Sequence, residues 1–142
     1  MMIKSFLLIV FLSILSFSGN STHLMGGDIT WTCQGGQYTF KLVIYRDCNS
    51  ADINTISQEL KVWGHPTVNL IECFFVSRTD LSPLCTQISG GPEMLECGNG
   101  ANTGNGMGAI ERIIYESNPQ TLSGTPPIEG WVFSYEDFSR SN

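Results

Sequence analysis

Basic residues are scarce in this sequence. It holds 7 Lys and Arg residues against 13 Asp and Glu residues, which gives a formal net charge of -6. Proteins bind nucleic acids and anionic membrane surfaces mainly through basic patches. We therefore expect neither a nucleic acid nor an anionic membrane surface to be a partner.

Metal-binding and catalytic motifs are also sparse. The chain contains no C-x-x-C pair, and its histidines are limited to His23, near the expected mature start, and His65, in a turn beside Pro66. A zinc ribbon needs paired cysteines, and a catalytic thiol needs a nearby histidine. The sequence thus predicts no metal, no cofactor and no catalytic residue.

A glycine-rich run at residues 98–108, GNGANTGNGMG, lacks what a ligand-binding loop would need. It has no Lys-Ser/Thr pair to hold a phosphate and no Asp or Glu to hold calcium. Such low-complexity sequence buries little surface. We expect a mobile loop there.

The N-terminal segment has the form of a secretory signal peptide. Lys4 precedes an apolar run over residues 6–17, and small residues follow at Ser18, Gly19 and Ser21. A membrane anchor is the alternative, but the run is short for a span of about 20 residues. We predict that residues 1–21 are removed and that residues 22–142 are secreted or held at the cell surface without a membrane span.

Helical periodicity is scarce, and one stretch reads as a β-hairpin. Two strands, residues 28–33 and 38–46, flank Gly35-Gly36, a pair that tolerates the positive φ of a tight turn. Alternation then predicts a shared core face and three cross-strand pairs. These are Cys33 with Tyr38, Trp31 with Phe40, and Ile29 with Leu42.

Four further strands complete an all-β pattern. They are expected at residues 55–63, 67–77, 109–116 and 130–136, with Ile56 on the apolar face of the first. The mixed pattern of the second predicts either a bulge or burial on both faces. A ribbon with one apolar face needs a second layer. We therefore predict one immunoglobulin-like antiparallel β-sandwich over residues 22–142, incomplete at its C-terminus, with a core that includes Trp31, Phe40, Leu42 and Trp131.

Two stretches resemble a known family. The run THLMGGDITWTCQGGQYTFKLVIYRDC, with His23, Gly26-Gly27-Asp28, Trp31, Cys33 and Tyr45-Arg46-Asp47-Cys48, is similar to the N-terminal module of secreted gliding-motility-associated or PKD-repeat proteins of gliding bacteria. GWVFSYEDFSRSN resembles the module's later strand, but Phe138-Ser139 stand where the family has two cysteines. The resemblance implies an adhesion module at the start of a longer cell-surface protein that uses the type IX export route.

Five cysteines in an exported chain predict disulfides and one unpaired thiol. Cys85 and Cys97 share an irregular region, so we predict that they pair. Cys33 and Cys48 lie at opposite ends of the hairpin and should not pair, so the odd thiol is one of these two or Cys73. The resemblance implies that a family cysteine is left over here or is paired again with Cys73.

Some polar and aromatic residues are candidates for function. The nearest to acid–base pairs are Glu136-Asp137, Glu93 with Glu96, and Asp47. Loop acids are usually solvated, so catalysis is not expected from them. Arg46 is expected to form a structural ion pair or to bind loop backbone. Trp63 and Tyr45 are possible surface-binding residues that could stack on a sugar, although either could instead pack in the core.

These features predict a non-catalytic extracellular structural or adhesion module whose partner is a protein or a glycan, with further domains of a longer protein beyond it. One alternative is a free-standing secreted module that binds carbohydrate or protein. A secreted hydrolase is the third alternative.

Overall fold

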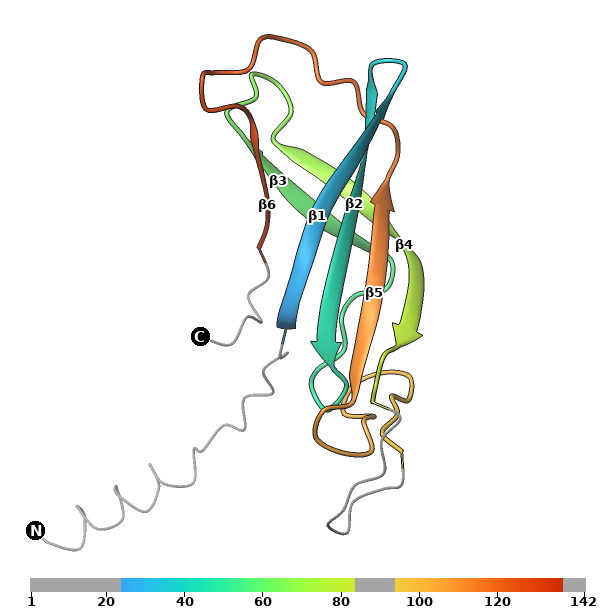
Figure 1. Cartoon of the computed structure of the whole chain (residues 1–142). Helices are drawn as coiled ribbons and strands as arrows, with labels where there is room; N and C mark the ends of the chain where they lie inside the picture. Colours follow the sequence, from blue (N-terminus) through green and yellow to red (C-terminus); the bar gives the residue numbers. More distant parts are fainter. Residues whose placement is uncertain (1–23, 84–93, 137–142) are drawn as a thin grey trace, which may run out of the picture.

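The protein forms six β-strands and no helix in the part that a computed structural model describes, residues 24–83 and 94–136 (Figure 1). The all-β class predicted from the sequence is confirmed. The strands are β1 (Leu24–Gln34), β2 (Gln37–Asp47), β3 (Ser57–Trp63), β4 (Leu70–Asp80), β5 (Ile110–Ser117) and β6 (Val132–Tyr135). The predicted signal peptide lies outside the described residues.

The hairpin of β1 and β2 has the predicted register. Trp31 lies opposite Phe40, and Ile29 lies opposite Leu42. The turn residues Gly35 and Gly36 have φ values of +59° and +79°. Glycine adopts this left-handed backbone without the steric cost that a Cβ atom brings. The two-residue turn therefore fixes which side chains of both strands face the core.

The strands form one antiparallel sheet in the order β1-β2-β5-β4-β3-β6. The sheet curls until β6 comes close to β1, so it is nearly closed. An immunoglobulin-type sandwich has the first, second, fifth and fourth strands in one layer and the third, sixth and seventh in the other. The six described strands have the same neighbours as the first six strands of such a sandwich, with β1, β2, β5 and β4 in one layer and β3 and β6 in the other.

Strand β4 joins the two layers. Its N-terminal half pairs with β3, and its C-terminal half pairs with β5. The register with β5 shifts between Phe75 and Ser77, which leaves Val76 as an extra, exposed residue. Such a bulge bends a strand and increases its twist. Of the two predicted alternatives, the bulge is thus present, at the point where β4 passes from one layer to the other.

The core lies inside the curled sheet. Its buried side chains come from β2, β3, β4 and β5 and include Phe40, Leu42, Ile44, Leu60, Val62, Ile71, Ile113 and Tyr115. Phe40 and Leu42 are buried as predicted, but Trp31 is 60% exposed and Trp131 is only half-buried. Ile56 is exposed as well, because β3 begins one residue after it. The prediction of one core that contains both tryptophans was wrong.

Phe40→Ala is expected to lower the free energy of unfolding by about 3–5 kcal/mol, since it leaves a cavity in a tightly packed core. Phe40 is 1% exposed, and its ring lies 4.6 Å from that of Phe133. Phe74, on the outer face of β4, is 39% exposed and supplies the matched control. In denaturant titrations Phe74→Ala should cost far less, and equal losses would contradict the assignment of the core face.

Candidate functional site

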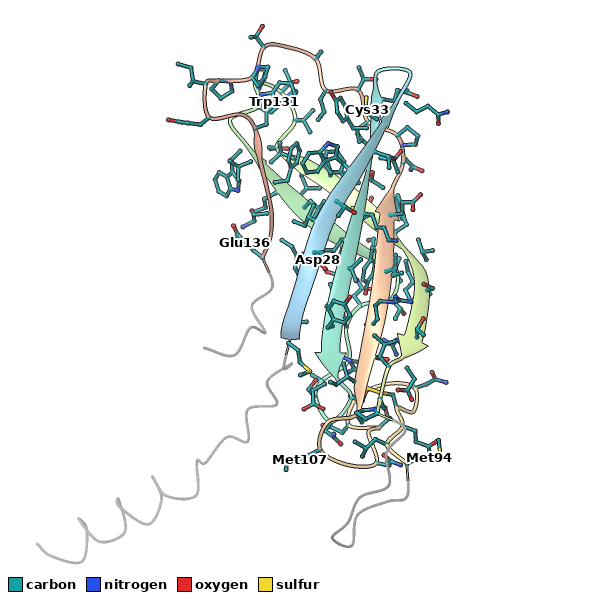
Figure 2. The ribbon with its side chains drawn as sticks, in the orientation of Figure 1. Asp28, Cys33, Met94, Met107, Trp131 and Glu136 are labelled. Atoms are coloured by element: carbon teal, nitrogen blue, oxygen red, sulfur yellow. A yellow bond between two sulfur atoms is a disulfide. The ribbon has the colours of Figure 1, made fainter. Side chains whose placement is uncertain are left out.

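Strands β1 and β6 occupy the two ends of the strand order, so each has one edge without a partner strand among the described residues. We call the space between these two edges the seam. Core-facing residues of β2, namely Phe40, Leu42 and Ile44, border it. Figure 2 shows Trp131 just before β6, Glu136 at the other end of β6, and Asp28 on β1.

Two cavities lie along the seam. One, of about 400 Å³, is lined by Leu24–Ile29 of β1, Leu42–Ile44 of β2 and Tyr135 of β6. The other, of about 240 Å³, is lined mainly by aromatic and other apolar side chains: Trp31, Tyr38, Phe40, Leu122, Pro126, Gly130, Trp131 and Phe133. Pockets with apolar and aromatic walls are the common form of binding sites. The seam is therefore the candidate site.

The seam exposes side chains that face the core side of the sheet. Trp31 shares that face with its partner Phe40, yet 60% of its surface is accessible. Ile29 shares it with Leu42 and is only partly buried. Across the seam, Phe133 is also partly buried. These side chains keep apolar surface in water because no described strand covers the gap between β1 and β6.

Two ring nitrogens near the aromatic cavity have no hydrogen-bond partner among the described residues. They are Nε1 of Trp131 and Nε2 of His65, and both atoms are buried. The two rings lie 4.6 Å apart. Nδ1 of His65 accepts the backbone N–H groups of Thr67 and Val68, so the neutral ring carries its proton on Nε2. Two buried N–H groups without a described partner thus lie beside an aromatic wall.

The opposite end of the sheet is held together by Arg46, whose side chain is fully buried. Its Nε donates to Glu111 across the β2–β5 pair at 2.6 Å. Its other nitrogens donate to the backbone carbonyls of Ser50, Ala51 and Gly100. The predicted structural use of Arg46 is confirmed, and it includes both an ion pair and loop backbone. The pair is buried rather than exposed.

The glycine-rich run is attached to this end of the sheet. Asn102 and Thr103 donate backbone N–H groups to the carbonyls of Ser50 and Cys48. Gly104 lies so close to Asn49 that a Cβ atom there would come within 2.8 Å of its Nδ2. We expected a mobile loop, but backbone hydrogen bonds and one buried arginine hold the run against β2. Its glycines permit this close approach.

The disulfide differs from the prediction. Cys97 is bonded to Cys48, with a Cα–Cα distance of 5.6 Å, so the predicted pair with Cys85 was wrong. Cys85 lies outside the described residues. The attached loop brings Cys97 to the end of β2, a contact that sequence spacing does not reveal. The prediction that Cys33 and Cys48 do not pair is confirmed.

Two cysteines of the described part are free, the exposed Cys33 and the buried Cys73. Burial, together with the nearby charges of Glu116 and Glu72, raises the pKa of the Cys73 thiol to about 11. A protonated, buried thiol is a poor nucleophile and behaves as a small apolar side chain. Cys73 is therefore a core residue and not a candidate for chemistry.

Two of the acidic candidates, Asp47 and Glu136, have local structural partners. Asp47 accepts the backbone and side-chain N–H groups of Asn49. Glu136 pairs with Lys61 at the surface. The backbone N–H of Glu96 donates to Asn105, and this glutamate lies in the attached loop. Glu93 and Asp137 lie outside the described residues. Of the two histidines, only His65 lies within the described residues, and its Nδ1 accepts hydrogen bonds from backbone N–H groups of its own turn.

The predicted surface aromatics lie on the outer face of the sheet. Trp63 is 53% exposed, and its Nε1 donates to Ser134 at 3.0 Å. Tyr45 is half-buried and lies opposite Arg112. Their strands, β3 and β2, are not neighbours, so the structure does not combine these two residues into one surface. The sequence pattern predicts Trp31 and Trp131 in the core, whereas the structure places both on the seam.

In the described residues no group of three or more His, Cys, Asp and Glu could hold a metal ion. That same part of the chain has no helix that is both long and apolar enough to cross a membrane.

Replacing Cys97 by serine is expected to lower the free energy of unfolding by about 4 kcal/mol, because the disulfide closes a loop with a sequence separation of 49 residues. Cys33→Ser, which changes an exposed free thiol, is the matched control and should be nearly neutral. Denaturant titrations with and without reductant measure both effects. A loss that persists after wild type and Cys97→Ser are both reduced would point to a cause other than the disulfide.

Acid should lower the stability of the loops at the end of the sheet that Arg46 holds together. Burial opposes the charged form of Asp52. The hydrogen bond and ion pair with Arg78, the backbone N–H of Ile53 and the charge of Arg46 together outweigh burial and lower the pKa of Asp52. Burial also opposes the charged form of Asp80, but hydrogen bonds from Ser82 and Cys97 lower that pKa. A carboxylate whose pKa is lower in the folded state than in the unfolded state stabilises the fold at pH values above its unfolded pKa. That stabilisation is lost as the pH falls through the pKa of the folded state.

Melting temperatures should therefore fall below about pH 4, where carboxylates with ordinary pKa values become protonated in the unfolded chain. Asp52→Asn should melt lower than the wild type at neutral pH and approach it in acid. A difference between the two proteins that stays constant from neutral pH to pH about 2 would contradict this linkage.

No protein-family model, curated protein or solved structure matches this chain. The resemblance to the modules of gliding bacteria therefore stays a prediction. The seam and the closed end of the sheet are therefore the features that bear on function.

Proposed function

We propose that this chain is a non-catalytic extracellular adhesion module of a bacterial cell-surface protein. The observation that carries the proposal is the seam, where core-facing apolar side chains stay exposed between two strand edges. Scattered apolar residues are normal on a surface, but a contiguous apolar patch commonly marks a site of interaction. The resemblance to modules of gliding bacteria would assign such a surface to adhesion.

The disulfide supports an extracellular location. Cys48–Cys97 ties β2 to the loop before β5, and structural disulfides are typical of oxidising compartments. The expected signal peptide agrees with this location. Secretion or display at the cell surface is part of the proposal.

The use of charged residues supports binding rather than chemistry. The buried pair of Arg46 and Glu111 holds the β2–β5 ladder and two loops. Glu136 and Asp47 have structural partners. A catalytic site usually combines perturbed ionisable groups with a cavity. The lining of the larger cavity includes Asp28 as its single charged residue, and the aromatic cavity is lined by no charged residue.

A free-standing carbohydrate-binding module is the second candidate. It is favoured by the unpartnered N–H donors of Trp131 and His65 beside the aromatic cavity. Sugar rings place C–H groups against aromatic faces and hydroxyl oxygens against such donors. This candidate predicts loss of glycan binding in Trp131→Ala, whereas protein-mediated adhesion depends more on Trp31.

The exported chain, fixed to beads, should adhere to cells or to protein-coated surfaces and release no product from polysaccharide or peptide substrates. Trp31→Ala should reduce retention by about tenfold, because exposed aromatic residues dominate many interfaces. Phe74→Ala, which removes an aromatic side chain from the outer face, is the control. Equal retention of both variants would contradict the proposal, and product release would favour a hydrolase. Retention on a glycan array that depends on Trp131 would favour the second candidate.

A further inference from the structure

We infer that Asn99 is a site of covalent modification, where the chain loses a side-chain amide as ammonia and gains an isoaspartyl link. The dipeptide Asn-Gly occurs at Asn99-Gly100 and at Asn105-Gly106, both within the glycine-rich run. The folded structure leaves the first site reactive and protects the second. The reaction needs only water, so the inference goes beyond the proposed adhesion and is independent of it.

The reacting atoms lie next to each other in the chain. The backbone nitrogen of Gly100 bonds to Cγ of Asn99, its proton passes to a solvent base, and the side-chain nitrogen takes up a proton and leaves as ammonia. Water then opens the cyclic imide at one of its two carbonyls. Opening at the side-chain carbonyl gives aspartate, whereas opening at the backbone carbonyl leaves Gly100 bonded through Cγ, as isoaspartate. The net reaction consumes one water and releases one ammonia.

Glycine in the second position favours the attack at both sites. A glycine has no Cβ atom beside its nitrogen, so the approach to the asparagine side chain is not hindered. The backbone N–H groups of Gly100 and Gly106 donate to no backbone carbonyl of the described residues. Both nitrogens are therefore free to react, and any difference between the sites lies in the asparagines.

The side chain of Asn105 is held by two hydrogen bonds. Its Oδ1 accepts the backbone N–H of Glu96 at 2.9 Å, and its Nδ2 donates to the carbonyl of Met94 at 2.8 Å. Attack on Cγ makes that carbon tetrahedral and displaces both atoms from these partners. Loss of two hydrogen bonds slows a reaction by at least about tenfold. Asn105 is exposed, so hydrogen bonding and not burial protects it.

Asn99 is exposed and has no such restraint. The loop around it is anchored on either side, where Gly98 donates to the carbonyl of Thr103 and Asn102 donates to that of Ser50. Between these two anchors, no hydrogen bond to the side chain or to the backbone N–H of Asn99 occurs within the described residues. The Asn99 amide can therefore change its geometry without loss of a contact.

Modification at Asn99 reaches the buried Arg46. The carbonyl of Gly100 accepts Nη2 of Arg46 at 3.0 Å and the hydroxyl of Thr103 at 3.1 Å. An isoaspartyl link adds one methylene to the backbone between that carbonyl and Cys97, which the disulfide holds in place. The longer backbone should displace the carbonyl and weaken its contact with the guanidinium.

The test ages the exported, oxidised chain in mildly alkaline buffer, where the attacking nitrogen loses its proton more readily. Peptide mass spectrometry follows both amides, and an isoaspartyl methyltransferase labels the product. Both sites read Gly-Asn-Gly, so they are matched in sequence. In the folded chain the amide of Asn99 should disappear at least about tenfold faster than that of Asn105. In the reduced and denatured chain the two rates should become similar.

Two variants separate the added charge from the longer backbone. Asn99→Asp carries the new negative charge without the extra methylene, and it should melt at the temperature of the fresh wild type. Asn99→Gln should stay unmodified during the same ageing and keep its melting temperature, because glutamine closes the corresponding ring far more slowly. Aged wild type should melt lower, by an amount that follows its isoaspartyl content.

An Asn99 amide that survives in the folded chain, under conditions that convert the denatured chain, would overturn the inference. Equal rates at the two sites of the folded chain, or faster loss at Asn105, would overturn it as well. Aged wild type that melts together with aged Asn99→Gln would reject the predicted effect on Arg46. Adhesion is measured on fresh protein, so its failure would leave the modification site intact.

Discussion

The buried pair of Arg46 and Glu111 is the interaction on which the closed end of this protein depends. The two residues lie opposite each other on β2 and β5, and both face the interior. Arg46 also lies 3.6 Å from Asp52, and Arg78 lies 3.3 Å from Glu111. Removal of Arg46 or Glu111 would leave a buried charge without its nearest counter-ion, which is more costly than loss of a surface pair. Because Arg46 also holds carbonyls from two loops, one guanidinium fixes the strand pair and the connections around it.

The closed end of the sheet and the seam therefore differ in how firmly they are held together. At the ends of β2 and β5, a disulfide, an ion pair and backbone hydrogen bonds close the structure. Between β1 and β6 there is no ladder in the described part of the chain, and apolar side chains remain accessible. The floor of the seam is formed by Phe40, Leu42 and Ile44 of β2, a strand that is paired on both sides, with β1 and with β5.

Local features were readable from the sequence, and features that depend on distant contacts were not. The hairpin register follows from Gly35-Gly36 and the alternation beside it, so it could be predicted residue by residue. Alternation also placed Trp31 on the core face. Whether another strand covers that face depends on the order of the sheet, which no local pattern encodes. Cys97 meets Cys48 only through the attached loop, so nearness in sequence favoured the wrong partner, Cys85.

The disulfide also changes the path by which the chain can fold. Arg46 and Glu111 are separated by 65 residues, and pairings of this range slow the folding of β-proteins. Once Cys48 and Cys97 are joined, the covalent path between the two strands runs from β2 through the bridge and a short stretch to β5. Loop closure then costs about 1 kcal/mol less. Oxidation thus shortens the chain segment that must close when β2 and β5 pair.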